Sequence, residues 1–152
     1  MAELKDRLRT DLTTAMKARD TVRTRTLRSA LTAVSTAEVA GRTARELSDD
    51  EVIKVLAREA KRRREAADAF DAAGRAEQAS AERAEGDVLE AYLPAQLGDD
   101  ELAAIVTEGI AESGASGPRA MGQVMKVVTP KIAGRAEGAR VAAEVRRQLG
   151  DG

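Results

Sequence analysis

The sequence predicts an all-α fold, and three observations support this. Across most of the chain, apolar residues recur at intervals of three and four, which is the period of an amphipathic helix. Alanine supplies much of the 43% apolar share, and tyrosine and phenylalanine each occur once, so the composition favours helix. No stretch shows convincing alternation at a period of two, and we therefore expect essentially no sheet.

The first two helices are expected within the first forty or so residues. The leucine spacing from Leu4 onward predicts a helix that ends near Lys17–Asp20. Asp20 is placed to cap a second helix, because a short carboxylate side chain can accept from the free backbone amides of a first turn. The second helix is expected to run toward Gly41, which would serve as its C-terminal cap.

A capping box predicts the start of the third helix. In Ser48-Asp49-Asp50-Glu51 the serine hydroxyl accepts from the backbone three residues on, Glu51 reaches back, and Leu47 precedes the box as a staple. This helix is expected to stop at Gly74, and a fourth, weakened by Gly86, to span about Glu77–Leu93. Four residues of the fourth helix are expected in the core: Ala81, Val88, Leu89 and Tyr92.

Tyr92-Leu93-Pro94 ends this pattern and divides the chain. Proline disfavours a helical conformation in the residue before it and cannot donate to the helical ladder, so the fourth helix must end there. We therefore expect two domains: residues 1–93 form a bundle of about four helices, and residues 94–152 form a small domain of three helices.

The three helices after Pro94 are shorter. Asp99 is expected to cap the first, which ends at Ser113-Gly114. Pro118 suits the first turn of the second, and Thr129-Pro130 is expected to break that helix. The last helix is expected to carry three apolar residues: Val141, Val145 and Leu149.

The composition excludes most familiar active sites. The chain has no cysteine, histidine or tryptophan, which excludes a thiolate nucleophile, an imidazole base and a Cys/His metal site. The acidic triplets 49–51 and 99–101 lie at expected helix starts, where capping accounts for them better than catalysis or Mg²⁺ binding. Phe70 and Tyr92 are expected to fill core volume. We expect no catalytic residue, cofactor or metal.

The net charge of −1 argues against wholesale binding of polyanions, but two stretches are locally basic. Lys61, Arg62, Arg63 and Arg64 follow Lys54 and Arg58 on the third expected helix and would present a cationic ridge to phosphates. For this run and for the second stretch alike, a solvated face balanced by acidic neighbours is the favoured interpretation. The second stretch lies around the start of the second helix: Lys17, Arg19, Arg23, Arg25 and Arg28.

A further candidate site follows Met121. Gly122 costs up to about 1 kcal/mol relative to alanine inside a helix, which suggests that something approaches the backbone there. Gln123 is its neighbour, and Lys126, Lys131 and Arg135 would form a cationic edge beside it. With two aromatic residues the chain cannot stack single-stranded bases, so any RNA would be recognised by shape and phosphates.

Several motifs together resemble the GatB/YqeY family in its stand-alone YqeY form, over essentially the whole chain. The motifs are Ala15-Met16-Lys17, Thr26-Leu27-Arg28, Lys61 to Ala66, Glu82 with Glu85, Tyr92-Leu93-Pro94 and Met121-Gly122-Gln123-Val124-Met125. The last of these, with Lys126 and Gly134 downstream, is similar to the tail domain of the B subunit of the glutamine-dependent tRNA amidotransferase, which helps to hold the tRNA.

The resemblance implies a non-catalytic accessory role rather than amide transfer, since the chain is too short for the kinase-like subunit and has no recognisable amidase nucleophile network. A label of carbon–nitrogen ligase with glutamine as amido-N-donor would apply by homology only. The first hypothesis is a module that binds tRNA through the basic residues above. The alternative is a protein-interaction module that docks amidotransferase subunits through exposed apolar helix faces.

The first twelve residues carry charges every few positions and lack an apolar run of signal-peptide length. We therefore expect a cytoplasmic protein that does not enter a membrane.

Overall fold

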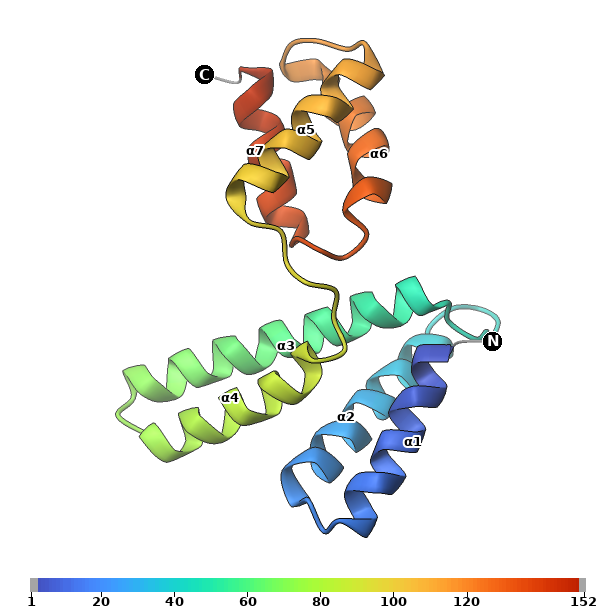
Figure 1. Ribbon diagram of the computed structural model, residues 1–152, viewed down its shortest axis with the longest axis vertical. Helices are drawn as coiled ribbons and strands as arrows, with labels where there is room; N and C mark the ends of the chain where they lie inside the picture. Colours follow the sequence, from blue (N-terminus) through green and yellow to red (C-terminus); the bar gives the residue numbers. More distant parts are fainter. Residues whose placement is uncertain (1–2, 151–152) are drawn as a thin grey trace. The chain divides into compact units, whose positions relative to one another are not determined.

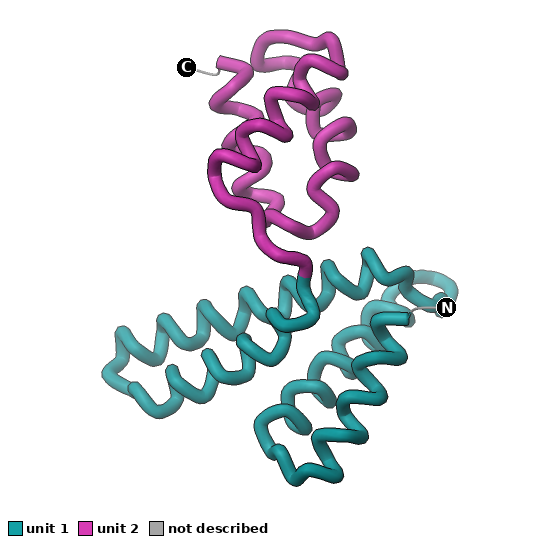
Figure 2. Tube along the Cα trace, viewed as in Figure 1, with its two compact units in different colours: residues 1–93 teal, residues 94–152 magenta. Residues whose placement is uncertain are grey.

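The computed structural model describes residues 3–150 and confirms the all-α fold, with seven α-helices, one 3₁₀ helix and no strand in that range (Figure 1). The chain divides into two compact units, Met1–Leu93 and Pro94–Gly152 (Figure 2). We call them unit 1 and unit 2. The division falls at the junction that the sequence indicates. That the units are independently folding domains stays a prediction.

Unit 1 consists of two helical hairpins. Helices α1 (Glu3–Lys17) and α2 (Thr21–Glu38) form the first, and α3 (Asp49–Ala72) and α4 (Ala76–Glu90) form the second (Figure 1). Helix α2 contacts both α3 and α4, and α1 contacts α3. The main apolar core lies where the two hairpins meet, and Ala67 and Ala79 are fully buried as well, on α3 and α4 of the second hairpin.

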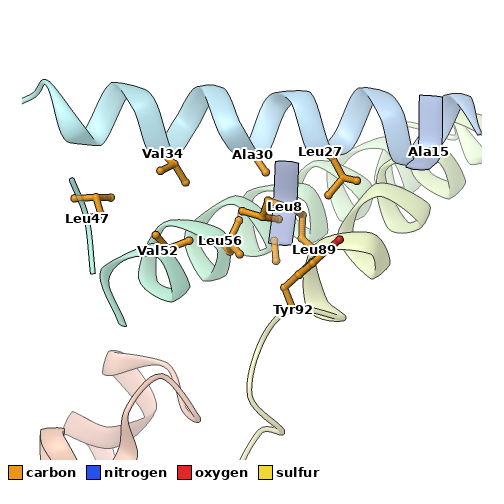
Figure 3. Packing of buried hydrophobic residues seen from close by; sticks show 11 residues of the cluster. Leu8, Ala15, Leu27, Ala30, Val34, Leu47, Val52, Leu56, Leu89 and Tyr92 are labelled. Carbon is orange, nitrogen blue, oxygen red and sulfur yellow. The ribbon is translucent and has the colours of Figure 1, made fainter. Parts of the chain in front are cut away.

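Leucines and valines from all four helices fill the core of unit 1, together with small alanines (Figure 3). Its largest fully buried side chains are Leu8, Leu27, Leu56 and Leu89. Ala30 and Ala60 are also almost completely buried, and their size lets neighbouring helices approach closely. The high alanine content that predicts helix thus also sets how tightly the helices pack.

The predicted N-terminal caps of α2 and α3 are present. Asp20 Oδ1 accepts from the backbone amide of Arg23 at 3.0 Å. Ser48 Oγ accepts from the amide of Glu51, and Glu51 Oε1 accepts from the amide of Ser48, both at 3.2 Å, which completes the capping box. A hydrogen bond from Arg45, followed by that from the Ser48 amide, lowers the pKa of Glu51 to about 2. This helix start is therefore held by three residues.

The prediction that α2 runs to Gly41 was wrong. The helix ends at Glu38, and Val39 is its C-terminal cap. The Glu38 carboxylate accepts from Lys5 Nζ at 2.7 Å and from the backbone amide of Leu47 at 3.3 Å. These tertiary bonds hold the helix end against α1 and the segment before α3. A capping rule based on neighbouring residues cannot predict them.

The core face of α4 also differs from the prediction. Ala81 is exposed, Ala79 is fully buried in its place, and the helix ends at Glu90 instead of Leu93. A Cβ placed on Gly86 would lie 3.6 Å from the Cβ of Arg63. The glycine is therefore a contact with α3, and the buried stripe passes through it.

Tyr92 closes unit 1 just before the junction and lies in the core, as expected. Its side chain is 7% exposed, its hydroxyl donates to Asp11 Oδ2, and the guanidinium carbon of Arg7 lies 4.7 Å from the ring centroid. Phe70 is only half-buried. Leu93 packs against the core of unit 1, whereas Leu97 belongs to the core of unit 2.

Unit 2 contains α5 (Asp99–Ser113), the 3₁₀ helix η1 (Pro118–Ala120), α6 (Met121–Ile132) and α7 (Gly138–Leu149). Each of the three α-helices contacts the other two. Gly114, at φ +64°, ends α5 as predicted. The core of unit 2 consists of Leu97, Leu102, Val106, Ala120, Val124, Val128, Ile132, Val141 and Val145.

Two predictions for unit 2 were wrong. Asp99 is not the cap of α5: Gly98 holds that position, and Asp99 is the first helical residue and accepts from Arg140 Nη2 at 2.9 Å. Pro130 does not break α6, which continues to Ile132. The missing amide affects only the last turn, and burial of Val128 and Ile132 keeps that turn in place.

Tyr92 should titrate late. Burial, followed by the hydrogen bond to Asp11, raises its pKa to about 12. As the only tyrosine in a chain without tryptophan, it can be followed by tyrosinate absorbance. Because the folded pKa exceeds the unfolded value of about 10, its contribution to stability is fully present below pH 10 and lost as the pH rises toward 12. A midpoint near 10 in the folded protein would contradict the described environment.

Gly109→Ala should destabilise unit 2. The new Cβ would lie 2.4 Å from Cγ2 of the fully buried and stiff Val128, so we expect a loss of about 1–2 kcal/mol after a small gain in helix propensity. Gly122→Ala is the matched control. Nothing lies within 4 Å of its Cβ position, and it should stabilise by a few tenths of a kcal/mol to about 1 kcal/mol. Denaturant unfolding followed by circular dichroism measures both, and equal effects would count against the described α5–α6 packing.

Candidate functional site

The predicted site residues fall into two separate groups. Lys61, Arg62, Arg63 and Arg64 lie on α3 in unit 1, and Gly122, Gln123, Lys126, Lys131 and Arg135 lie on or just after α6 in unit 2. The two groups therefore belong to different units of the chain.

Arg63 is held by bonds within unit 1. Its Nη1 lies 2.5 Å from Glu85 Oε2, and its Nη2 donates to Ser29 Oγ at 3.1 Å. Glu85, which is 5% exposed, also accepts from Arg25 Nε at 2.7 Å. One buried carboxylate thus joins arginines from α2 and α3 to α4, and Arg63 is a structural residue of this hairpin contact.

The rest of the α3 run also has partners inside the chain. Arg62 Nη1 donates to Glu59 Oε1 at 3.2 Å, and Arg64 donates to Glu90. Lys61 is not free either. The positive charge of this run is therefore largely balanced within unit 1.

Unit 2 contains a shallow depression of about 570 Å³ over η1 and the start of α6. It brings together three of the predicted residues, Gly122, Gln123 and Lys126, and adds Arg119. The remaining lining residues are Ala115, Ser116 and Ala120. Arg119 was not among the residues predicted from the sequence, although its position four residues before Gln123 is the spacing of one helical turn.

The two cations of this depression are available for binding. Arg119 and Lys126 are exposed, and neither side chain makes an ion pair or hydrogen bond with any residue between 3 and 150. No atom lies within 4 Å of a Cβ placed on Gly122, so nothing in the described chain occupies the space above the glycine. The depression therefore presents two unpaired positive charges beside an accessible helix backbone.

Lys131 and Arg135 do not belong to the depression. Lys131 Nζ lies 2.9 Å from Glu112 Oε1 and 3.7 Å from Glu108 Oε1, and the bond to Glu112 raises its pKa. The carbonyl of Arg135 accepts from the Leu97 amide at 2.8 Å, and its Nε donates to the Ala95 carbonyl at 3.5 Å. Both residues hold elements of unit 2 together.

Within residues 3–150, no cluster of three or more acidic side chains is arranged to hold a metal ion. The acidic triplets at the starts of α3 and α5 occupy first turns, where the helix dipole favours negative charge. No described helix has the length and apolarity needed to cross a membrane.

A family model described as Yqey-like protein matches residues 5–149. The chain belongs to the YqeY-like family. The match spans both units, so the Glu85 contact in unit 1 and the depression in unit 2 lie within one YqeY-like region. No curated protein matches the sequence.

Glu85→Gln tests whether Arg63 is part of the fold. Removing the carboxylate charge leaves the half-buried guanidinium of Arg63 with only the more distant Glu82, 3.5 Å from its Nη1, as a counterion. We therefore expect a loss of about 1–2 kcal/mol, a figure that already allows for the solvent exposure of Arg25. Glu90→Gln removes the same charge from an exposed pair and should cost less than about 0.5 kcal/mol. Thermal unfolding compares the variants, and equal losses would contradict the distinction.

Proposed function

We propose that this YqeY-like chain is a non-catalytic accessory protein of glutamine-dependent tRNA amidation and that it binds tRNA through the depression of unit 2. The observation that carries the proposal is the pair of exposed, unpaired cations, Arg119 and Lys126, beside the open backbone at Gly122. The resemblance of residues 121–126 to the amidotransferase tail supports tRNA as the polyanion.

The chemistry of the depression suits a phosphate backbone. A guanidinium offers a planar fork to two phosphate oxygens, and an ammonium adds a compact point charge. Gln123 supplies a neutral side chain that can donate or accept beside them. Gly122 lies in the first turn of α6, at the positive end of the helix dipole, so an approaching phosphate meets no side chain there.

Recognition in this proposal depends on backbone shape, not on stacking. The two aromatic residues, Phe70 and Tyr92, both lie in unit 1, and Tyr92 is buried. Unit 2 therefore has no aromatic platform for unpaired bases, and a folded RNA with closely spaced phosphates is the better match. The carbon–nitrogen ligase activity would reside in the amidotransferase, which this chain assists by contact with the tRNA or with the enzyme.

The alternative, docking of a protein through an extended apolar face, has less support. Among the described residues, the exposed large hydrophobic side chains are Met16 and Val39, and both belong to unit 1. Unit 2 buries its large apolar residues or packs them against its own core.

Electrophoretic mobility shift with tRNA at two salt concentrations tests the proposal. In the double variant Arg119→Ala/Lys126→Ala, the slope of log affinity against log salt should become shallower by about 1.4–1.8, because each lost phosphate contact contributes about 0.7–0.9. Arg146→Ala is the matched control, since it removes an exposed cation on α7 that does not line the depression. Absence of tRNA binding at low salt, or an equal effect of the control, would refute the RNA role.

Gly122→Ala supplies a second test, in which stability and tRNA affinity are expected to change in opposite directions. The variant should be at least as stable as the wild type, because the added methyl group meets no atom of the chain. It should nevertheless bind tRNA less tightly if a phosphate approaches the backbone there. Unchanged affinity would place the contact elsewhere on the surface.

A further inference from the structure

We propose that the α1–α2 turn of unit 1 is a docking surface for an acidic protein segment that carries a large apolar side chain. The surface is a shallow depression of about 590 Å³, separate from the proposed tRNA site of unit 2. Its lining residues are Met16, Arg19, Thr21, Thr24, Arg25 and Arg28.

Met16 provides the apolar part of this surface. It lies in the last turn of α1 and is 49% exposed. Among the described residues, Val39 is the other large hydrophobic residue that is exposed. Thioether side chains are flexible and polarizable, and they adapt to different apolar partners. Arg28 Nη2 lies 3.8 Å from Met16 Sδ, so the guanidinium edges the exposed methionine instead of pairing with a carboxylate.

The charge around Met16 is positive and poorly balanced. Arg19 and the neighbouring Lys17 have no ion-pair or hydrogen-bond partner for their side chains within residues 3–150. Arg25 is paired with the buried Glu85. The nearest acidic residue in sequence, Asp20, is engaged as the cap of α2 through the Arg23 amide. An incoming carboxylate would therefore meet one guanidinium without a partner among the described residues, that of Arg19, and a second, that of Arg28, whose partner is the Met16 sulfur instead of a carboxylate.

The backbone of Arg19 is the second observation. Its φ is +57°, a left-handed conformation in which glycine is the usual residue at a helix end. The amide of Asp20 donates to the Ala15 carbonyl at 3.0 Å across this turn, so the hydrogen bonding that ends α1 involves only main chain. The Arg19 side chain makes no hydrogen bond or ion pair with the described residues that would stabilise this turn. Backbone conformations that are unfavourable for the residue present concentrate at functional sites.

Charge complementarity selects the occupant. A bare phosphate backbone would pair with the arginines but leave Met16 in water, and the surface has no aromatic ring on which a base could stack. A leucine or phenylalanine flanked by aspartates or glutamates would cover Met16 and offer carboxylates to Arg19 and Arg28, for which bidentate geometry is favourable. An acidic protein segment satisfies both features at once.

Arg19→Gly separates binding from folding. Because the left-handed φ favours glycine, the variant should fold and retain its melting temperature while losing one unpaired guanidinium. Arg42→Gly is the matched control: it makes the same change at an exposed residue beyond the other end of α2, whose 18 residues span about 27 Å. Met16→Gln removes the apolar contact and keeps a good helix former.

The probe is an array of synthetic 15-residue peptides, each with one central leucine flanked by zero to six glutamates, applied to the full-length chain. Binding should increase with the number of glutamates. It should fall about five- to tenfold in Arg19→Gly, as expected for loss of a charge-assisted contact, and similarly in Met16→Gln, but not in Arg42→Gly.

A labelled 12-nucleotide RNA is measured in parallel. If the RNA, and not the acidic peptides, binds in a manner that requires Arg19, the surface belongs to nucleic acid and the proposal is overturned. It is also overturned if peptide binding does not depend on the glutamates, if it survives Arg19→Gly, or if no peptide binds. None of these results bears on Arg119 and Lys126, so the tRNA role of unit 2 stands or falls separately.

Discussion

Unit 1 depends on satisfying a single buried carboxylate. Glu85 faces the junction of three helices at 5% exposure, and an ion in that environment must be paired and hydrogen-bonded. Arg63 and Arg25 supply the donors, which fixes α3 and α2 against α4. The neighbouring Gly86 faces Arg63 across the same contact. Through Arg25 and through Ser29, which accepts from Arg63, this buried carboxylate cluster adds a polar contact between the two hairpins to their shared apolar core.

Pairing within the chain also changes which basic residues can be assigned to a binding site. The densest run, residues 61–64, looks like a polyanion-binding ridge in the sequence, yet its members have partners inside the chain. Arg119 and Lys126 are seven residues apart and belong to no run, and they are the ones left unpaired in a depression of unit 2. A phosphate can bind where basic side chains have no acidic partner in the chain, and this does not follow from how many basic residues are adjacent in the sequence.

Sequence patterns predicted the features of the fold that depend on interactions between residues close together in the chain. The period of apolar residues gave the helices, and short-range hydrogen bonds at Asp20 and Ser48 gave their starts. The failures have tertiary causes. Glu38 ends α2 early by bonding to Lys5 and Leu47, and burial of Ile132 holds α6 past Pro130. The sequence likewise placed Gly122, Gln123 and Lys126 in one site, but it could not show that Arg135 is engaged with the chain near Ala95 or that Arg119 is free.

The central claim is that unpaired cations of unit 2, and not the basic run of α3, meet the tRNA. Nuclear magnetic resonance of the isotope-labelled full-length chain during a tRNA titration tests this residue by residue. The account predicts amide shift changes centred on residues 119–126, with residues 61–64 unaffected. Changes centred on residues 61–64, or no saturable change anywhere, would contradict it.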